Sequence, residues 1–439
     1  MEGPLKEDGR SLMERTPWIT KSSPLLMREA SDLRTGDYEI ELKSFRLCLS
    51  WICLDQSSYW KTGLTWSVFL LLAIGTPMVS HFFLSCSTCD NNHRRPYDGV
   101  IQLSLSLLSA LSFFNLSHWS RSYGLKKFLF LDKLQDESEA IRNRYNGHLQ
   151  KAMRRLCIFV LPCFLLESFY RTWWYSTGRS EIPYVWNMYV SDTVICVMQL
   201  CSWVYRISTF ILVCIMYQLI CSLHQSKLED FCQVFQEETG IDVILKEHLK
   251  LRCRLRVISH RFRGFILFTL VIVTGSQAVS LLMTTRSSAH NNIFEAGELA
   301  LCSINMVTGL FICLRSATKI THKAHSITSL AAKWHAWAAV CACEDINNGC
   351  LVSTQSSFPT WVVDEDDDGS DDQGSVKIFP VLAETMSFQK RQAIVSYLEN
   401  NKAGMTVYGF TMDRAWLHGI FGIEMALLLW LLNKTIGTL

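Results

Sequence analysis

Four charged side chains lie inside runs of apolar residues, and they have the clearest potential for chemistry. Glu167 and Arg171 occur at i and i+4 near the end of one run, a spacing that predicts a structural ion pair. Arg206 and Glu424 lie nearer the middle of two other runs. Because an isolated charge is costly in a bilayer, we expect either an Arg206–Glu424 pair or a Glu424 carboxylate that faces a polar cavity or pore.

The second alternative would give Glu424 a role in ion conduction. A ring of carboxylates, one from each copy of the chain in an oligomer, would favour cations. Side chains at helical spacing around Glu424 would line the same pore. The candidate pore-lining residues are His418, Phe421, Glu424, Leu428 and Leu431.

Aromatic residues are concentrated near Arg171, and two explanations stay open. One is a belt of aromatic side chains at the membrane surface. The other is an apolar ligand pocket, which bends at Pro77 and Pro162 would help to open. The candidate pocket residues are Glu167, Tyr170, Trp173, Trp174 and Tyr189.

Motifs of soluble enzymes are missing from the sequence, which has no Walker A loop, no GxSxG and no HExxH. We therefore expect no enzymatic activity, no cofactor and no metal. A metal site is conceivable in one histidine- and cysteine-containing segment, but its irregular spacing and interleaved lysines favour an ordinary polar helix face. That segment contains His322, His325, His335, Cys341 and Cys343. A net charge of +2 also argues against a nucleic-acid partner.

Seven apolar runs are long enough to position these residues inside a membrane. The chain is 49% hydrophobic and 19% charged, and a spanning helix needs about 20 mostly apolar residues. The sequence therefore predicts an all-α, polytopic seven-transmembrane helix protein. The expected spans are Thr62 to Leu84, Val100 to Ser120, Leu156 to Tyr175, Val190 to Leu223, Phe265 to Thr285, Leu299 to Leu314 with its flanks, and about Trp416 to Leu432.

Lysine and arginine residues predict the orientation of these spans. Alternate connecting segments hold 35 of them on one side and 6 on the other, with Arg206 left inside a span. Because basic residues stay in the cytosol, the N-terminus is expected inside and the C-terminus outside. A G-protein-coupled receptor has the opposite orientation, so that class is excluded.

Four segments of different composition are expected along the chain. Residues 1–43 read as a disordered cytosolic tail, and residues 44–345 as a membrane domain that begins with an interfacial segment at Ser44 to Trp60. Residues 346–380 carry an acidic run from Asp364 to Asp372 and read as a disordered loop. Residues 381–439 would hold a cytosolic helix and the seventh span. Cys86 and Cys89 are either free or bonded to each other.

Long cytosolic connections with amphipathic patterns favour a helical bundle made by extensions of the spans. In Leu223 to Arg263, Gly240 would separate two such helices. Separate helices lying on the membrane surface are the alternative.

This layout resembles the insect gustatory and olfactory receptors, and the sequence looks like a plant family of unknown function called gustatory-receptor-like. The segments that carry the resemblance are LCLSWICLDQSS (Leu47 to Ser58), FLFLDKL (Phe128 to Leu134) and VYGFTMDRAWLHGIFGIEMALLLWLL (Val407 to Leu432). The insect receptors have a Thr-Tyr pair and a Gln-Phe pair in the last helix. Here Val407 separates Thr406 from Tyr408, and no Gln-Phe pair follows.

The resemblance implies a homotetrameric, or otherwise oligomeric, ligand-gated cation channel. The seventh helix would line the pore, the cytosolic bundle would hold the subunits together, and a small-molecule ligand would bind in the outer half of the helices. We expect the lipid bilayer of the plasma membrane as the location. The alternative is a non-channel scaffold or signalling protein that acts through its cytosolic helices.

Overall fold

The structure is a computed structural model that describes residues 59–83, 97–123, 139–177, 187–234, 240–286, 293–348, 357–360, 377–380 and 388–436. All of these residues belong to the segment Leu49–Leu439. The predictions for the tail at 1–43, for most of the interfacial segment, and for Cys86 and Cys89 lie outside the described residues.

Helices make up nearly all of the described residues, in agreement with the predicted all-α class. They are α2 (Tyr59–Phe69), the π-helix η1 (Leu70–Gly75), α3 (Thr76–Phe83), α4 (Asp98–Tyr123), α7 (Glu139–Thr177), α8 (Met188–Val234), α9 (Ile241–Arg286), α10 (Ile293–Asn348), α11 (Phe388–Asn400) and α12 (Arg414–Ile436). The segments α2, η1 and α3 follow one another without a break.

Six of the described helical segments are long and apolar enough to cross a membrane: Trp60–Phe82, Asp98–Trp119, Tyr189–Cys232, Ile241–Thr285, Gly297–Ala336 and Arg414–Asn433. Each contains or overlaps one of the seven expected spans, and Tyr189–Cys232, Ile241–Thr285 and Gly297–Ala336 extend well beyond theirs. The expected third span, Leu156 to Tyr175, does form a helix within α7, but it is not among the six. Its stretch carries Glu167 and Arg171, and ionised side chains reduce the apolar character of a span.

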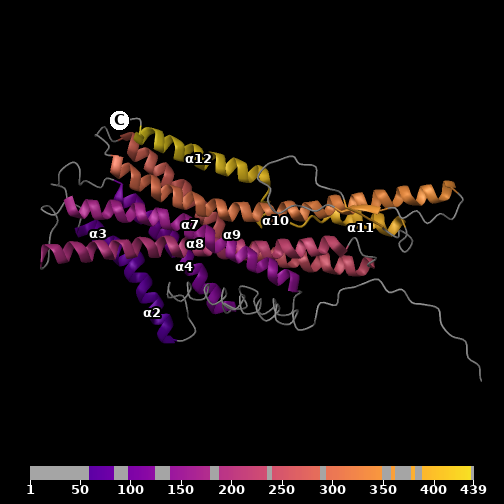
Figure 1. The fold of residues 1–439 in the computed structure, drawn as a ribbon, viewed down its shortest axis with the longest axis horizontal. Coiled ribbons are helices and arrows are strands. Elements are labelled where there is room, and N and C mark those ends of the chain that lie inside the picture. The colour runs from indigo at the N-terminus through magenta and orange to yellow at the C-terminus, as the bar shows by residue number, and fades with distance from the viewer. Residues whose placement is uncertain are drawn as a thin grey trace, which may run out of the picture. The chain divides into compact units, whose positions relative to one another are not determined.

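Four helices are much longer than a membrane is thick. The 56 residues of α10 correspond to about 84 Å, against about 30 Å for the hydrocarbon core. Figure 1 shows α8, α9 and α10 running side by side well beyond the N-terminal end of α12, and α10 packs against both of the others. The predicted break is also present, because α8 ends at Val234 and α9 begins directly after Gly240.

The extensions of these helices pack together as a bundle, whereas the predicted cytosolic position of this bundle stays a prediction. Lys323 on α10 forms an ion pair with Glu229 on α8, with 3.1 Å between Nζ and Oε1. On α9, Arg252 Nη1 donates to the side chain of Asn401, just past the end of α11, at 2.7 Å. Helix α11 itself buries its apolar face against α9 and α10. Separate helices lying on the membrane surface would not make these contacts.

Two short antiparallel strand pairs complete the described chain. Strands β1 (Ser357–Thr360) and β2 (Lys377–Pro380) pair across the acidic segment, whose run from Asp364 to Asp372 lies outside the described residues. Strands β3 (Thr406–Val407) and β4 (Phe410–Thr411) form a hairpin directly before α12. Its turn has positive φ at Tyr408 and Gly409 (49° and 92°), as a tight hairpin turn requires.

Helix α8 lies at the centre of the packing and contacts α4, α7 and α10. Most of the side chains in its middle section are buried, among them Phe210 and Tyr217. The ring centroids of Tyr217 and Phe262 on α9 lie 4.6 Å apart, and those of Phe262 and Trp119 on α4 lie 4.5 Å apart. This central position allows α8 to carry polar side chains that neighbouring helices shield from lipid.

Candidate functional site

A cluster of buried charged and polar side chains joins α7 to four of the candidate spans. Its centre is Arg171 on α7, which is 1% exposed. The Arg171 guanidinium forms ion pairs with Glu167 one turn earlier, at 2.7 Å, and with Glu298 on α10, at 2.8 Å. The structure therefore confirms the predicted i, i+4 ion pair and adds a second carboxylate to it.

Amide and hydroxyl groups extend this cluster to α8 and α3. Arg171 Nη1 donates to the side-chain oxygen of Gln199 on α8, and the Gln199 amide nitrogen donates to the Ser80 hydroxyl on α3. All three side chains are buried. One arginine thus cross-links four helices by charge-assisted or amide hydrogen bonds, which strengthen when water is excluded.

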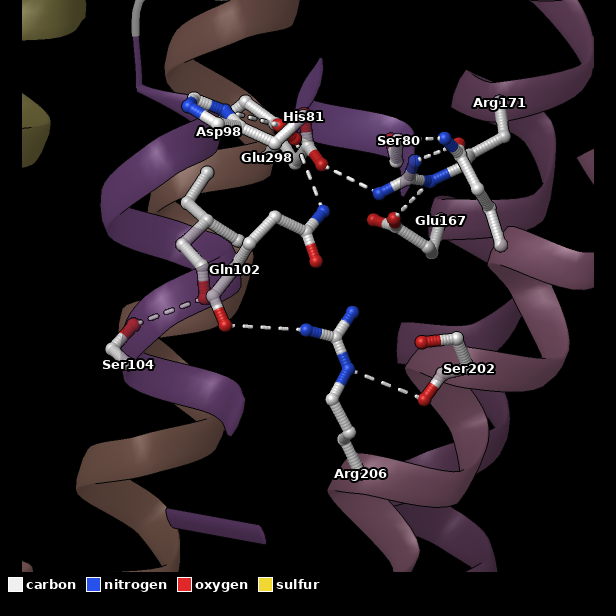
Figure 2. A network of polar contacts seen from close by, with 12 residues as sticks. Ser80, His81, Asp98, Gln102, Ser104, Glu167, Arg171, Ser202, Arg206 and Glu298 are labelled. Atoms are coloured by element: carbon white, nitrogen blue, oxygen red, sulfur yellow. Dashed lines mark hydrogen bonds and ion pairs between the residues drawn. The ribbon is translucent and has the colours of Figure 1, made fainter. Parts of the chain in front are cut away.

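Asp98 and Gln102, one turn apart on α4, form the next part of the cluster. The Gln102 side-chain nitrogen donates to Asp98 Oδ1 at 3.0 Å, and His81 Nδ1 lies 3.9 Å from Asp98 Oδ2. Figure 2 shows these groups beside Glu298 and above Arg206. The His81 side chain is 54% exposed whereas Asp98 and Gln102 are buried. Polar groups therefore lead from the surface of the chain to its interior.

Arg206 on α8 ends this polar path. It donates to the main-chain oxygens of Ser202 and Gln102, both at 3.3 Å, and to the Ser106 hydroxyl at 3.4 Å. Ser106 and Ser202 in turn donate to the main-chain oxygens of Ala73 and Leu72 in η1. A π-turn leaves carbonyl groups available to side chains of other helices. In η1 these carbonyl groups accept from Ser106 and Ser202, the two serines that contact Arg206.

The structure does not join Arg206 to Glu424. The carboxylate of Glu424 on α12 accepts a hydrogen bond from Thr274 on α9 instead. The nitrogen of the Gln277 side chain donates to Glu424 Oε2 at 3.2 Å in the amide orientation that satisfies both groups. Of the two alternatives from the sequence, the Arg206–Glu424 pair is therefore wrong. Helix α9 supplies polar partners for Glu424, whereas α4 and α8 supply those for Arg206.

The pore-lining candidates lie on two sides of α12. Glu424, Leu428 and Leu431 are 2%, 6% and 2% exposed and face the interior of the chain. Phe421 packs its ring at 4.6 Å from Phe311 on α10, whereas His418 is exposed. The face expected to line a pore is therefore mainly the face that α12 buries within its own chain, because its only carboxylate needs partners there.

The aromatic candidates form packed contacts. Trp174 and Tyr175 make a buried cluster, with Tyr170 and Trp173 partly buried against it. The expected pocket residue Tyr189 lies at the start of α8 and is 61% exposed. The structure thus groups Tyr170, Trp173 and Trp174, places Glu167 in the ion-pair cluster, and leaves Tyr189 on the surface.

No group of three or more potential metal ligands gathers among the described residues. His322, His325 and His335 lie along α10, and the side chains of Cys341 and Cys343 fall outside the described part of the chain.

Sequence reasoning missed several members of the cluster: Ser80, Asp98, Gln102, Gln199 and Glu298. Asp98 and Glu298 stand just before the expected second and sixth spans, where a charge reads as a normal helix boundary. A signal was nevertheless present. Arg171 and Arg206 lie within apolar runs, and buried charges are usually paired. Their presence therefore predicts polar partners on other helices within the spans.

Six helical segments long and apolar enough to cross a membrane, packed with α7 around a buried ionic cluster, are the architecture of a multi-pass membrane protein. Among solved structures, the chain is similar to the insect olfactory receptor OR5 from Machilis hrabei, with a TM-score of 0.50 and 12% sequence identity over 90% of this chain and 99% of that chain. The same receptor in complex with eugenol gives a TM-score of 0.47, also with 12% identity and the same coverage.

The chain belongs to the family described as "Protein of unknown function (DUF3537)", whose model matches residues 40–423. Curated protein sequences yield no match. Family membership therefore agrees with the expected receptor-like family of unknown function, and the fold agrees with that of an insect olfactory receptor.

Proposed function

We propose that the chain is a ligand-gated cation channel, assembled from several copies, in the plasma membrane. The observation that carries this proposal is the fold similarity to an insect olfactory receptor across nearly the whole of both chains. The long extensions of α8, α9 and α10, with α11 packed against α9 and α10, give the chain a bundle that can hold neighbouring copies together.

The proposal includes α7 as a seventh span, which places the N-terminus inside and the C-terminus outside. The two charges in the apolar stretch of α7 do not oppose this, because Glu167 and Arg171 are each 1% exposed and neutralise each other. A paired and enclosed charge avoids most of the cost of an isolated charge in lipid.

The open face of α12 is the surface that we assign to the pore. Ile423 and Leu429 are 60% and 58% exposed on this face. Nothing lies within 4 Å of a Cβ added at Gly419 or Gly422. Small residues on this face would leave room for an aqueous path between copies. In this arrangement Glu424 fixes α12 to α9 through Thr274 instead of facing the ions.

Recordings from the purified full chain in planar bilayers test this function. We expect cation currents that change when a panel of small organic molecules is added. Ile423→Cys should make the currents sensitive to a charged thiol reagent. Val271→Cys on α9, a position equally exposed at 60%, is the matched control and should behave like the unchanged chain.

Two outcomes would count against the proposal. Silence under every ligand and voltage, with assembled oligomers present, would favour the scaffold or signalling alternative. If the thiol reagent blocked the currents of Val271→Cys but not those of Ile423→Cys, the pore would not lie at α12.

A further inference from the structure

The two arginines buried in the spans have different surroundings. Arg171 contacts two carboxylate groups at 2.7 and 2.8 Å. Arg206 is equally buried, at 2% exposed, yet no carboxylate lies within 4 Å of it among the described residues. Its hydrogen bonds go to two main-chain oxygens and one hydroxyl, at 3.3 to 3.4 Å. A buried cation with neutral partners alone is an unusual arrangement, because desolvation of the charge is poorly compensated.

The nearby carboxylates are occupied elsewhere. Glu167 and Glu298 bind Arg171, and Asp98 accepts the side-chain amide of Gln102 and lies close to His81. None of these contacts leaves a carboxylate directed at Arg206. The guanidinium therefore keeps hydrogen-bonding capacity for an acceptor that the described helices do not supply.

The side-chain oxygen of Gln102, a hydrogen-bond acceptor, lies beside the Arg206 guanidinium. Gln102 is 7% exposed, and its side-chain oxygen has no hydrogen-bond partner among the described residues. Its amide nitrogen is held by Asp98, which directs the oxygen away from Asp98. Figure 2 shows this amide and the Arg206 guanidinium pointing toward each other, and Arg206 already contacts the main-chain oxygen of Gln102.

We propose that Arg206 and Gln102 form a binding site for a small hydroxycarboxylate anion. The ligand's carboxylate would accept hydrogen bonds from the guanidinium, a pairing that a planar fork of donors favours. Its hydroxyl group would donate to the Gln102 side-chain oxygen. The ligand thereby satisfies both groups at once, and the exposed His81 marks the end of the cluster nearest the surface.

Ligand binding to the full chain in detergent or lipid nanodiscs tests the site without requiring channel activity, so a silent channel does not decide it. The probes are lactate and mandelate, each with its neutral amide (lactamide, mandelamide) and with the acid that lacks the hydroxyl (propionate, phenylacetate). We expect saturable calorimetric binding of at least one hydroxy acid. Its amide should bind at least tenfold more weakly, and the acid without the hydroxyl should bind several-fold more weakly.

Variants then locate the site. Arg206→Gln should reduce the affinity for the hydroxy acid at least tenfold, whereas Arg206→Lys should keep part of it. Arg154→Gln, at an exposed position of α7, is the matched control and should leave the affinity unchanged. The comparison of acid with amide uses the unchanged chain, so it decides the proposal even if Arg206→Gln fails to fold.

Three results would overturn the inference. They are binding of neither hydroxy acid, equal binding of acid and amide, and undiminished binding in a folded Arg206→Gln chain. In each case Arg206 would be a purely structural link between α4, α8 and η1.

Discussion

Single residues show how this chain places charge inside a membrane. Arg171 is neutralised by carboxylates from two helices, Arg206 is surrounded by neutral acceptors fixed by η1, and Glu424 is held by hydroxyl and amide groups. Only the first of these arrangements includes a pair that sequence spacing predicts. Glu298 lies 127 positions from Arg171, and no local pattern connects the two.

Loss of Arg171 should strongly destabilise the folded chain. In Arg171→Met, the carboxylates of Glu167 and Glu298 stay buried without their partner, and breaking a buried ion pair from one side costs about 3–5 kcal/mol. Thermal unfolding of the purified chain in detergent should show a large decrease in Tm.

The matched control for Arg171→Met is Lys250→Met, which removes the exposed Lys250–Glu247 pair of α9 at 3.1 Å. Surface pairs of this kind contribute about 0.2–1 kcal/mol, so its Tm should change little. Equal effects of the two substitutions would show that the Arg171 cluster does not stabilise the fold.

At the level of elements, the close packing of α8 and α10 depends on a glycine. A Cβ added at Gly309 on α10 would lie 2.3 Å from Cε1 of Phe210, a ring that is 1% exposed on α8. Such a contact requires the helices to separate or the buried ring to turn.

Gly309→Ala should therefore destabilise the chain by about 1–3 kcal/mol, as overpacked cores are. Gly275→Ala on α9, where nothing lies within 4 Å of the added Cβ, should be neutral or slightly stabilising because alanine favours helix. The measurement is thermal unfolding of both variants beside the unchanged chain. A neutral Gly309→Ala would mean that α8 and α10 are less tightly packed than the structure shows.

Helix existence could be predicted from the sequence, but packing between helices could not. Apolar runs and the break at Gly240 gave the helices and their long extensions, because these depend on local composition. The burial of Leu428 and Leu431, and the partners of Glu424, depend on where α9 and α10 lie against α12. The helical period shows which residues of α12 share a face. It does not show which of these faces packs against the other helices of the same chain.

At the scale of the whole molecule, the seven-span layout rests on α7. The described structure has six helical segments that satisfy length and composition for a span. Helix α7 adds a seventh, and the two charges in its apolar stretch, Glu167 and Arg171, are paired and enclosed. If α7 crosses the membrane, the two ends of the chain lie on opposite faces. The side with 35 of the 42 lysine and arginine residues is then the cytosolic side.

The most direct measurement is the accessibility of small epitope tags placed at residue 1 and at residue 439 of the full chain, in intact and in permeabilised cells. We predict that the tag at residue 439 is reached in intact cells and the tag at residue 1 only after permeabilisation. Tags that both require permeabilisation, or that are both reached without it, would contradict an odd number of spans and with it the receptor-channel arrangement.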